Sequence, residues 1–281
     1  MSRTRTFVLT LFAMLAFAGN SLLCRAAFNS SRIDAASFTS IRVAAGALAL
    51  WLIVRMRGGR HESAGSWPSA LALFAYAAAF SFAYLSLTAA TGALLLFGAV
   101  QATMIGFGLA AGERLRGRQT AGLACALGGL IGFLLPGLSA PPLPGSVLML
   151  LAGVAWGVYS LRGKGSGDPL RVTAGNFLRA VVFAAALSIV TLPWASLDGP
   201  GVGYAIASGA LASGIGYAVW YTALAGLKVT SAATVQLSVP VIAAVGGIAL
   251  LGEAPTLRLL LASVAILGGI ALVIVGKQRP L

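Results

Sequence analysis

The sequence GERLRGRQTAGLACALGG occupies residues 112–129, and the related sequence GEAPTLRLLLASVAILGG occupies residues 252–269. Both begin with Gly-Glu and end with Gly-Gly, so one offset of 140 residues superimposes them. The same offset brings Phe80 onto Trp220 without a gap. Such self-similarity predicts that the 281-residue chain consists of two copies of one structural unit.

The composition indicates that this unit lies in a membrane. Hydrophobic residues make up 59% of the chain, charged residues make up 9%, and the mean hydropathy is +0.94, which is far more apolar than a soluble domain. A helix needs roughly 20 mainly apolar residues to cross the hydrocarbon core. The expected fold is all-α and integral to the membrane, with ten transmembrane helices near residues 6–24, 35–54, 67–87, 91–111, 119–136, 145–161, 171–193, 202–226, 231–251 and 257–276.

Each copy then holds five spans, an odd number, so the second copy enters the membrane from the opposite side. This predicts two five-helix inverted-topology repeats, residues 1–140 and 141–281, related by a pseudo-two-fold axis in the membrane plane. The boundary falls in the loop 136–144, which is uncharged and rich in proline.

The positive charges favour one orientation of this bundle. Of the 19 Lys and Arg residues, 14 fall on the side of the termini, three on the other side and two within spans. This positive-inside pattern predicts a multi-pass protein of the cell (inner) membrane with cytoplasmic N- and C-termini. Arg3 and Arg5 before an apolar run also fit a signal peptide. The equivalent start of the second copy, at Leu148–Leu161, is internal to the chain, and this favours a span instead.

The arrangement resembles the drug/metabolite transporter superfamily, and within it the EamA-type permeases. The resemblance rests on Ala155-Trp156-Gly157, on an arginine early in spans 2 and 7, and on residues 231–253, SAATVQLSVPVIAAVGGIALLGE. That last stretch is similar to the ninth span of the family. The chain looks most similar to the YddG-type exporters of aromatic amino acids, which implies a membrane transporter with a substrate of that class.

The first copy departs from the family pattern in two places. Phe17-Ala18 stands where a Trp-Gly pair is usual, and Gln101 stands where many members have a helix-kinking proline. Both departures fall in the expected cavity, so they bear on what the protein binds.

The ionisable residues narrow the mechanism. All six acidic residues fall in loops or at span ends, and the single histidine, His61, lies in a loop. Proton-coupled exporters of cations place a carboxylate within a span, so facilitated diffusion is the simpler expectation, with coupling through Glu113 or Glu253 left open.

An intramembrane enzyme needs an acid–base pair, a metal site or an activated nucleophile, and almost none of these is present. Cys24 and Cys125 lack the number and spacing of a metal site, so neither a metal nor a cofactor is expected.

Aromatic and amide residues within spans are the main candidates for substrate contacts. Tyr76, Phe80 and Tyr84 recur every four residues and therefore share one helix face. Such stripes also occur in lipid-facing or packed positions, but hydroxyl and indole groups in hydrocarbon need polar partners. Amides suit a zwitterionic head group because each donates and accepts. The expected substrate-binding residues are Phe17, Asn20, Tyr76, Phe80, Tyr84, Gln101, Trp156, Tyr159, Tyr217, Trp220, Tyr221 and Gln236.

Three further residues within spans are expected to have gating or structural roles. Arg42 and Arg179 are the embedded charges, and an ionisable residue at such depth is a functional candidate. Repeat symmetry places them toward opposite faces, which favours a structural role, while contact with a substrate stays open. Pro240 interrupts span 9 and either frees a backbone carbonyl for the site or simply kinks the helix.

Two pairs of glycines predict close helix packing. Gly153 with Gly157, and Gly128 with Gly132, have the four-residue spacing of small residues at membrane helix interfaces.

These features predict an exporter of aromatic and other large apolar amino acids that works by alternating access, with a cavity lined by spans 1, 3, 4, 6, 8 and 9. The expected partners are this small-molecule substrate, an amino acid, and the lipid bilayer, with no nucleic acid; a monomer is possible. The alternatives are a carrier of other metabolites, such as nucleotide sugars, or of cationic drugs, and a channel-like pore.

Overall fold

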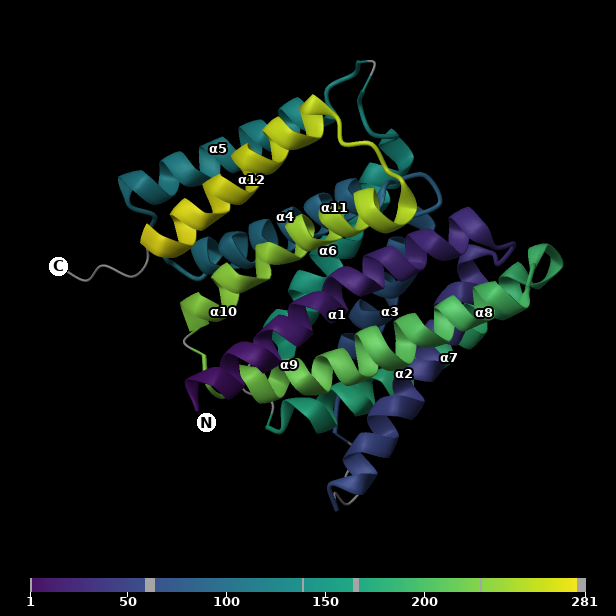
Figure 1. Ribbon diagram of the computed structural model, residues 1–281. Helices are drawn as coiled ribbons and strands as arrows, with labels where there is room; N and C mark the ends of the chain where they lie inside the picture. The colour runs from purple at the N-terminus through teal and green to yellow at the C-terminus, as the bar shows by residue number, and fades with distance from the viewer. Residues whose placement is uncertain (1, 59–63, 138, 164–166, 228, 277–281) are drawn as a thin grey trace.

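The computed structural model describes residues 2–58, 64–137, 139–163, 167–227 and 229–276. Regular structure in these ranges is helical (Figure 1). The elements are α1 (Arg3–Ser30), α2 (Ala35–Met56), α3 (Trp67–Ala83), α4 (Ala89–Ala110), α5 (Gly117–Leu134), α6 (Leu143–Gly163), α7 (Pro169–Thr191), the short 3-10 helix η1 (Leu192–Trp194), α8 (Gly199–Ile206), the π-helix η2 (Ala207–Ile215), α9 (Gly216–Leu224), α10 (Val229–Gln236), α11 (Ser238–Leu251) and α12 (Leu257–Gly276). Since α8, η2 and α9 form one continuous run, and α10 and α11 form another, each of the ten expected spans has a helical counterpart.

Eight of these helical runs are long and apolar enough to cross a bilayer, judged by length and composition. The other two are α3, which is apolar but has only 17 residues, and α5, which carries Arg118 and Gln119 in its first turn. Large apolar side chains such as Phe7, Ile189 and Val264 are exposed on the outside of the bundle, as contact with lipid requires.

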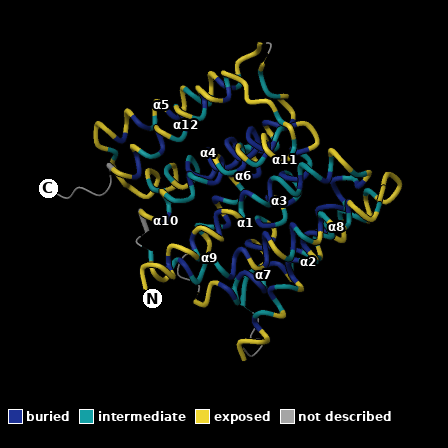
Figure 2. The backbone as a smooth tube through the Cα atoms, viewed as in Figure 1, coloured by how far each residue is buried: buried dark blue, intermediate teal, exposed yellow. Residues whose placement is uncertain are grey.

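The helix pairs that pack together define the bundle. Helix α2 packs on α7 and α5 packs on α12, while α6 contacts both α3 and α4, and α1 contacts η2, α9 and α11. Figure 1 shows α5 and α12 side by side at one edge. Buried positions gather around α1, α3, α4 and α6, whereas α5 and α12 are exposed over much of their length (Figure 2). Expected spans 5 and 10 are therefore peripheral.

Glycines allow the closest helix contacts, and here the sequence-based expectation was half right. A Cβ on Gly153 would lie 2.5 Å from the Cβ of Ala99, and one on Gly157 would lie 2.8 Å from Thr103, so the predicted packing of this pair is confirmed. The prediction for Gly128 and Gly132 is wrong, because a Cβ at either position would meet open space.

The α5–α12 contact instead uses glycines on a different face of α5, together with Gly269 of α12. A Cβ on Gly129 would lie 2.6 Å from the Cβ of Ala265, one on Gly122 would lie 2.6 Å from the carbonyl oxygen of Gly269, and one on Gly269 would overlap the backbone of Gly122. The second glycine of each repeated Gly-Gly pair thus lies in this contact.

The repeated Gly-Glu pairs end two helices. Gly112 follows α4 with φ +92°, and Gly252 follows α11 with φ +65°. These are left-handed conformations that glycine adopts without steric cost. In each case the following glutamate folds back on its own helix, and its carboxylate lies beside an earlier turn, at Gly108 for Glu113 and at Gly247 for Glu253.

Span 9 is broken between α10 and α11. Pro240 has no N–H to bond the carbonyl of Gln236, and its ring displaces that carbonyl. The backbone forms a tighter turn at Leu237, the residue after Gln236. In this turn the Leu237 N–H donates to the Thr234 carbonyl at 3.1 Å. The break therefore lies beside Gln236.

Candidate functional site

A cavity of about 520 Å³ lies in the middle of the bundle. Its walls come from α1, α3, α4, α6, α7, η2, α9 and α10. The lining runs from Asn20 in the middle of α1 and Phe80 near the end of α3 to Gly163 and Pro169, where α6 ends and α7 begins. The cavity therefore reaches the face of the bundle at which α6 ends and α7 begins.

Stacked and tilted aromatic rings form much of the wall. The indole of Trp156 stacks on the ring of Tyr217, with centroids 5.3 Å apart and planes inclined by 18°. It also contacts Tyr76 at 4.8 Å and Tyr159 at 5.3 Å, and Phe17 lies 5.7 Å from Tyr217. Aromatic pairs at these separations stabilise one another's positions, so the wall is an ordered, largely apolar surface.

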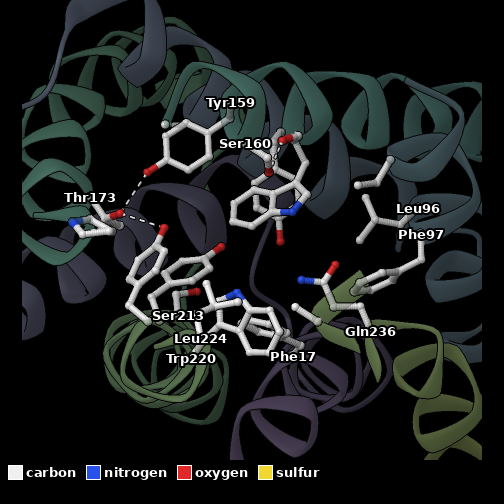
Figure 3. Close-up of a pocket in the computed structure, with 18 of the residues that line it drawn as sticks. Phe17, Leu96, Phe97, Tyr159, Ser160, Thr173, Ser213, Trp220, Leu224 and Gln236 are labelled. Carbon is white, nitrogen blue, oxygen red and sulfur yellow. Dashed lines mark hydrogen bonds between the residues drawn. The ribbon is translucent and has the colours of Figure 1, made fainter. Parts of the chain in front are cut away.

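At the end near α7, hydroxyl groups are joined in a chain. The Tyr159 hydroxyl donates to Thr173 Oγ1 at 3.3 Å, and the Thr173 hydroxyl donates to the Tyr221 oxygen at 3.0 Å. Figure 3 shows these bonds on the side of the cavity away from Gln236 and Phe97. The chain links α6, α7 and α9 around the cavity.

A second polar group lies at the opposite, inner end. Asn20 Nδ2 donates to the Tyr76 hydroxyl oxygen at 3.2 Å, and Asn20 Oδ1 accepts from the hydroxyl of Ser208 at 2.5 Å. Ser208 belongs to the π-helix η2. Such turns are rare within helices and are frequent at functional sites.

Two amides face the cavity from α4 and α10. Gln101 is buried and Gln236 is half-buried, and both line the cavity. Within the part of the chain that the structure describes, neither side chain hydrogen-bonds another residue. Their donors and acceptors are therefore available to a polar ligand. No cluster of three or more His, Cys, Asp or Glu side chains that could hold a metal ion occurs among the described residues.

The structure brings eleven of the twelve expected substrate-binding residues to this one cavity. The residues in its lining are Phe17, Asn20, Tyr76, Phe80, Gln101, Trp156, Tyr159, Tyr217, Trp220, Tyr221 and Gln236. Tyr84 lies outside the lining because α3 ends at Ala83, and its hydroxyl donates to the Ala89 carbonyl at 3.3 Å. Pro240 is also outside the lining.

Helix α7 was missed as part of the wall. It contributes Pro169, Val172 and Thr173, although spans 1, 3, 4, 6, 8 and 9 were the ones expected. Thr173 lies between Arg171 and Asn176 in a stretch of mixed polarity, and no periodic pattern marks it as a cavity residue. Its place in the site depends on how α7 packs against its neighbours.

The two embedded arginines have different surroundings. Arg179 Nη1 donates to the carbonyls of Ala64 and Gly175, at 2.8 and 3.0 Å. Arg42 is 2% exposed, and its Cζ lies 4.7 Å from the ring centroid of Phe80 and 5.4 Å from that of Tyr76. Both rings line the cavity, so Arg42 lies directly behind its wall.

Comparison with known proteins agrees with this architecture. The chain is 58% identical to a Pseudomonas aeruginosa protein named "Uncharacterized protein PA1977", over 99% of this chain and 97% of the relative. It is 27% identical to an "Uncharacterized transporter" of Archaeoglobus fulgidus, over 90% of this chain and 91% of the relative.

A solved structure described only as "Crystal structure of protein" aligns with a TM-score of 0.68 at 21% identity, covering 99% of this chain and 100% of that one. This likeness shows a shared fold. Residues 143–275 match the EamA-like transporter family. This family match lies in the second half of the chain, from α6 to α12.

Proposed function

We propose that this protein is an EamA-like membrane transporter of the drug/metabolite superfamily, and that it exports aromatic and other large apolar amino acids across the cell (inner) membrane by alternating access. The observation that carries the proposal is the cavity of about 520 Å³, whose walls combine nine aromatic residues with the amides of Asn20, Gln101 and Gln236. Small-molecule sites typically have this size and this mixture of apolar wall with few polar groups.

The two kinds of lining suit the two ends of such an amino acid. An aromatic side chain fits against Trp156 and its stacking partner Tyr217. A zwitterionic head group needs both donors and acceptors, which the polar groups of the lining supply, among them the uncommitted amides of Gln101 and Gln236.

We also propose that residues 1–140 and 141–281 are inverted repeats. The helix packing supports this, because each repeat's second helix contacts its counterpart, α2 with α7, and so do the fifth helices, α5 and α12. In addition, α3 packs on α6 much as α1 packs on α9. Repeats of this kind can exchange conformations, and that exchange would open the cavity to alternate sides.

With cytoplasmic termini, the open end of the cavity is the cytoplasmic one. The lining reaches Gly163 and Pro169, which border the same loop between α6 and α7, and the arginine distribution supports placing that loop inside. The described conformation is then inward-facing. Facilitated diffusion by a monomer is the simplest cycle, since no carboxylate is among the described residues that line the cavity.

Counterflow in proteoliposomes tests the proposal. Vesicles preloaded with unlabelled phenylalanine should accumulate labelled tryptophan transiently, and the uptake should saturate. A pore would give uptake without counterflow. Failure of phenylalanine to compete would reject the amino-acid assignment, and competition by a cationic drug or a nucleotide sugar instead would identify the alternative carrier.

A pH gradient separates uniport from proton coupling in the same vesicles. Uniport predicts that tryptophan uptake depends on its own gradient alone. A rate that follows the imposed pH difference would instead direct attention to Glu113 and Glu253.

A further inference from the structure

Arg42 is the one charged side chain in the described part of the chain that is almost fully buried, with 2% exposure. It extends from α2 to a position directly behind the cavity wall, where its guanidinium lies over the rings of the lining residues Phe80 and Tyr76. A guanidinium stays charged at any physiological pH. This position therefore holds a permanent positive charge within the bundle.

Nothing among the described residues neutralises this charge. The ion pairs of the described chain join Arg25 with Glu253 and Arg171 with Asp168. Arg42 Nη1 is buried and has no hydrogen-bond partner. The aromatic faces attract the cation, but a ring face does not replace an acceptor for the N–H groups of Nη1. An unpaired buried cation is strongly unfavourable in a membrane protein.

The equivalent arginine of the second repeat differs in this respect. Arg179 Nη1 donates to two backbone carbonyls, those of Ala64 and Gly175, which is the pattern of a residue that stabilises a loop. If both arginines had the same structural role, the N–H groups of both guanidinium groups should have similar hydrogen-bond acceptors. The unsatisfied Nη1 of Arg42 thus needs another explanation.

A second donor lies at the same end of the cavity. The Tyr76 hydroxyl oxygen accepts from Asn20, which leaves the hydroxyl hydrogen for another acceptor. Tyr76 lines the cavity and its ring lies against Arg42. The Arg42 guanidinium and the Tyr76 hydroxyl therefore lie close together, and the described chain places no acidic residue beside them.

We propose that Arg42 is the anion-recognition residue of this cavity and selects substrates that carry a carboxylate. The carboxylate binds at the Asn20–Tyr76 end, where Arg42 supplies its counter-charge, and the apolar part of the substrate extends along Trp156 toward the open end. The inference rests on the proposed amino-acid transport and adds that the carboxylate, more than the ammonium group, determines binding.

Four indole compounds test this with the unaltered protein: tryptophan, indole-3-propionate, tryptophanamide and tryptamine. Their dissociation constants can be measured by thermal shift or calorimetry in detergent. The two carboxylates should bind at least about tenfold more tightly than the two compounds without one, a difference of about 1.4 kcal/mol. Equal binding of tryptophan and tryptophanamide would overturn the role of Arg42 while leaving amino-acid transport intact. If none of the four binds, the proposed function fails and the inference fails with it.

Variants then assign the effect to Arg42. Arg42→Gln should weaken tryptophan binding roughly 30-fold or more, as loss of one partner of a buried charge pair does, and should leave tryptamine binding almost unchanged. Arg42→Lys should restore part of the preference for carboxylates. Arg171→Gln, which removes a half-exposed surface arginine, is the matched control and should bind like the wild type. A preference for carboxylates that survives in folded Arg42→Gln protein would contradict the inference, and the ligand series decides the question even if that variant does not fold.

Discussion

Arg25 Nε and Glu253 Oε1 lie 3.2 Å apart and join α1 to the end of α11 at the face opposite the cavity opening. The same glutamate accepts from the N–H of Ala89, the first residue of α4, at 2.9 and 3.1 Å. Arg25 Nη1 also donates to the Tyr84 carbonyl at 3.1 Å. The helix N-terminus favours a carboxylate, so this cluster holds α1, α3, α4 and α11 together. It closes the bundle at the face that the proposed orientation makes external.

Breaking this ion pair should favour the outward-open state. Cys24 is buried one residue from Arg25, whereas Cys125 is exposed, so a Cys125→Ala background leaves Cys24 as the sole thiol. In that background, Glu253→Gln should raise the rate at which an impermeant thiol reagent labels Cys24 from outside several-fold, because the external face opens more often. Arg32→Gln, at an exposed arginine in the loop after α1, is the control. An unchanged rate in folded Glu253→Gln protein would contradict the proposed closure.

The glycine contact between α5 and α12 makes a second prediction, with its control in the adjacent residue. Gly129→Ala introduces a Cβ 2.6 Å from that of Ala265, while Gly128→Ala meets open space. Overpacking a close contact costs about 1–3 kcal/mol. Thermal unfolding in detergent should therefore show a clear loss of stability for Gly129→Ala and little change for Gly128→Ala. Equal effects of the two substitutions would mean that the helices do not approach at Gly129.

Much of the architecture could be predicted because it depends on local patterns. Apolar runs of membrane length appear directly in the sequence, and residues four apart on one helix lie on one face. This is why Tyr76 and Phe80 were correctly expected together, and both line the cavity. Tyr84 follows the same spacing, but α3 ends one residue earlier, so the pattern no longer determines its direction.

The remaining features depend on contacts between distant segments. The π-helix η2 changes which residues of the following helix face the cavity, and no residue pattern in the sequence predicted this π-helix. Thr173 enters the cavity wall because α7 packs beside α9. Arg42 and Arg179 look equivalent in the sequence. They differ in the structure because Arg179 has the carbonyls of Ala64 and Gly175 as hydrogen-bond acceptors.

Asp34 predicts a pH dependence of stability at the loop before α2. Burial disfavours its charged form, but hydrogen bonds from Ser37, Ser196 and Ala36 outweigh burial and lower the pKa of Asp34 below its ordinary value. A lowered pKa stabilises the fold above the unfolded-state pKa of about 3.9, and this contribution is lost as the pH falls through the folded-state value.

Asp34→Asn isolates that charge, because asparagine also caps helices well. The wild type should unfold at a higher temperature than Asp34→Asn at neutral pH, and the difference should shrink as the pH falls below about 4. Thermal unfolding over this pH range measures it. A difference that stays constant with pH would mean that the ionised carboxylate contributes nothing.

Trp156 should be the most important aromatic residue for substrate binding, since it contacts Tyr76, Tyr159 and Tyr217 at once. Trp156→Ala removes the stacking surface and loosens these neighbours. Aromatic pairs contribute about 0.5–1.5 kcal/mol beyond burial, so the dissociation constant for tryptophan should rise about tenfold or more. Competition in proteoliposomes measures this change, with Trp194→Ala, 75% exposed in η1, as the control. If Trp156→Ala left the transport of both leucine and tryptophan almost unchanged, the aromatic wall would not be the site of side-chain recognition.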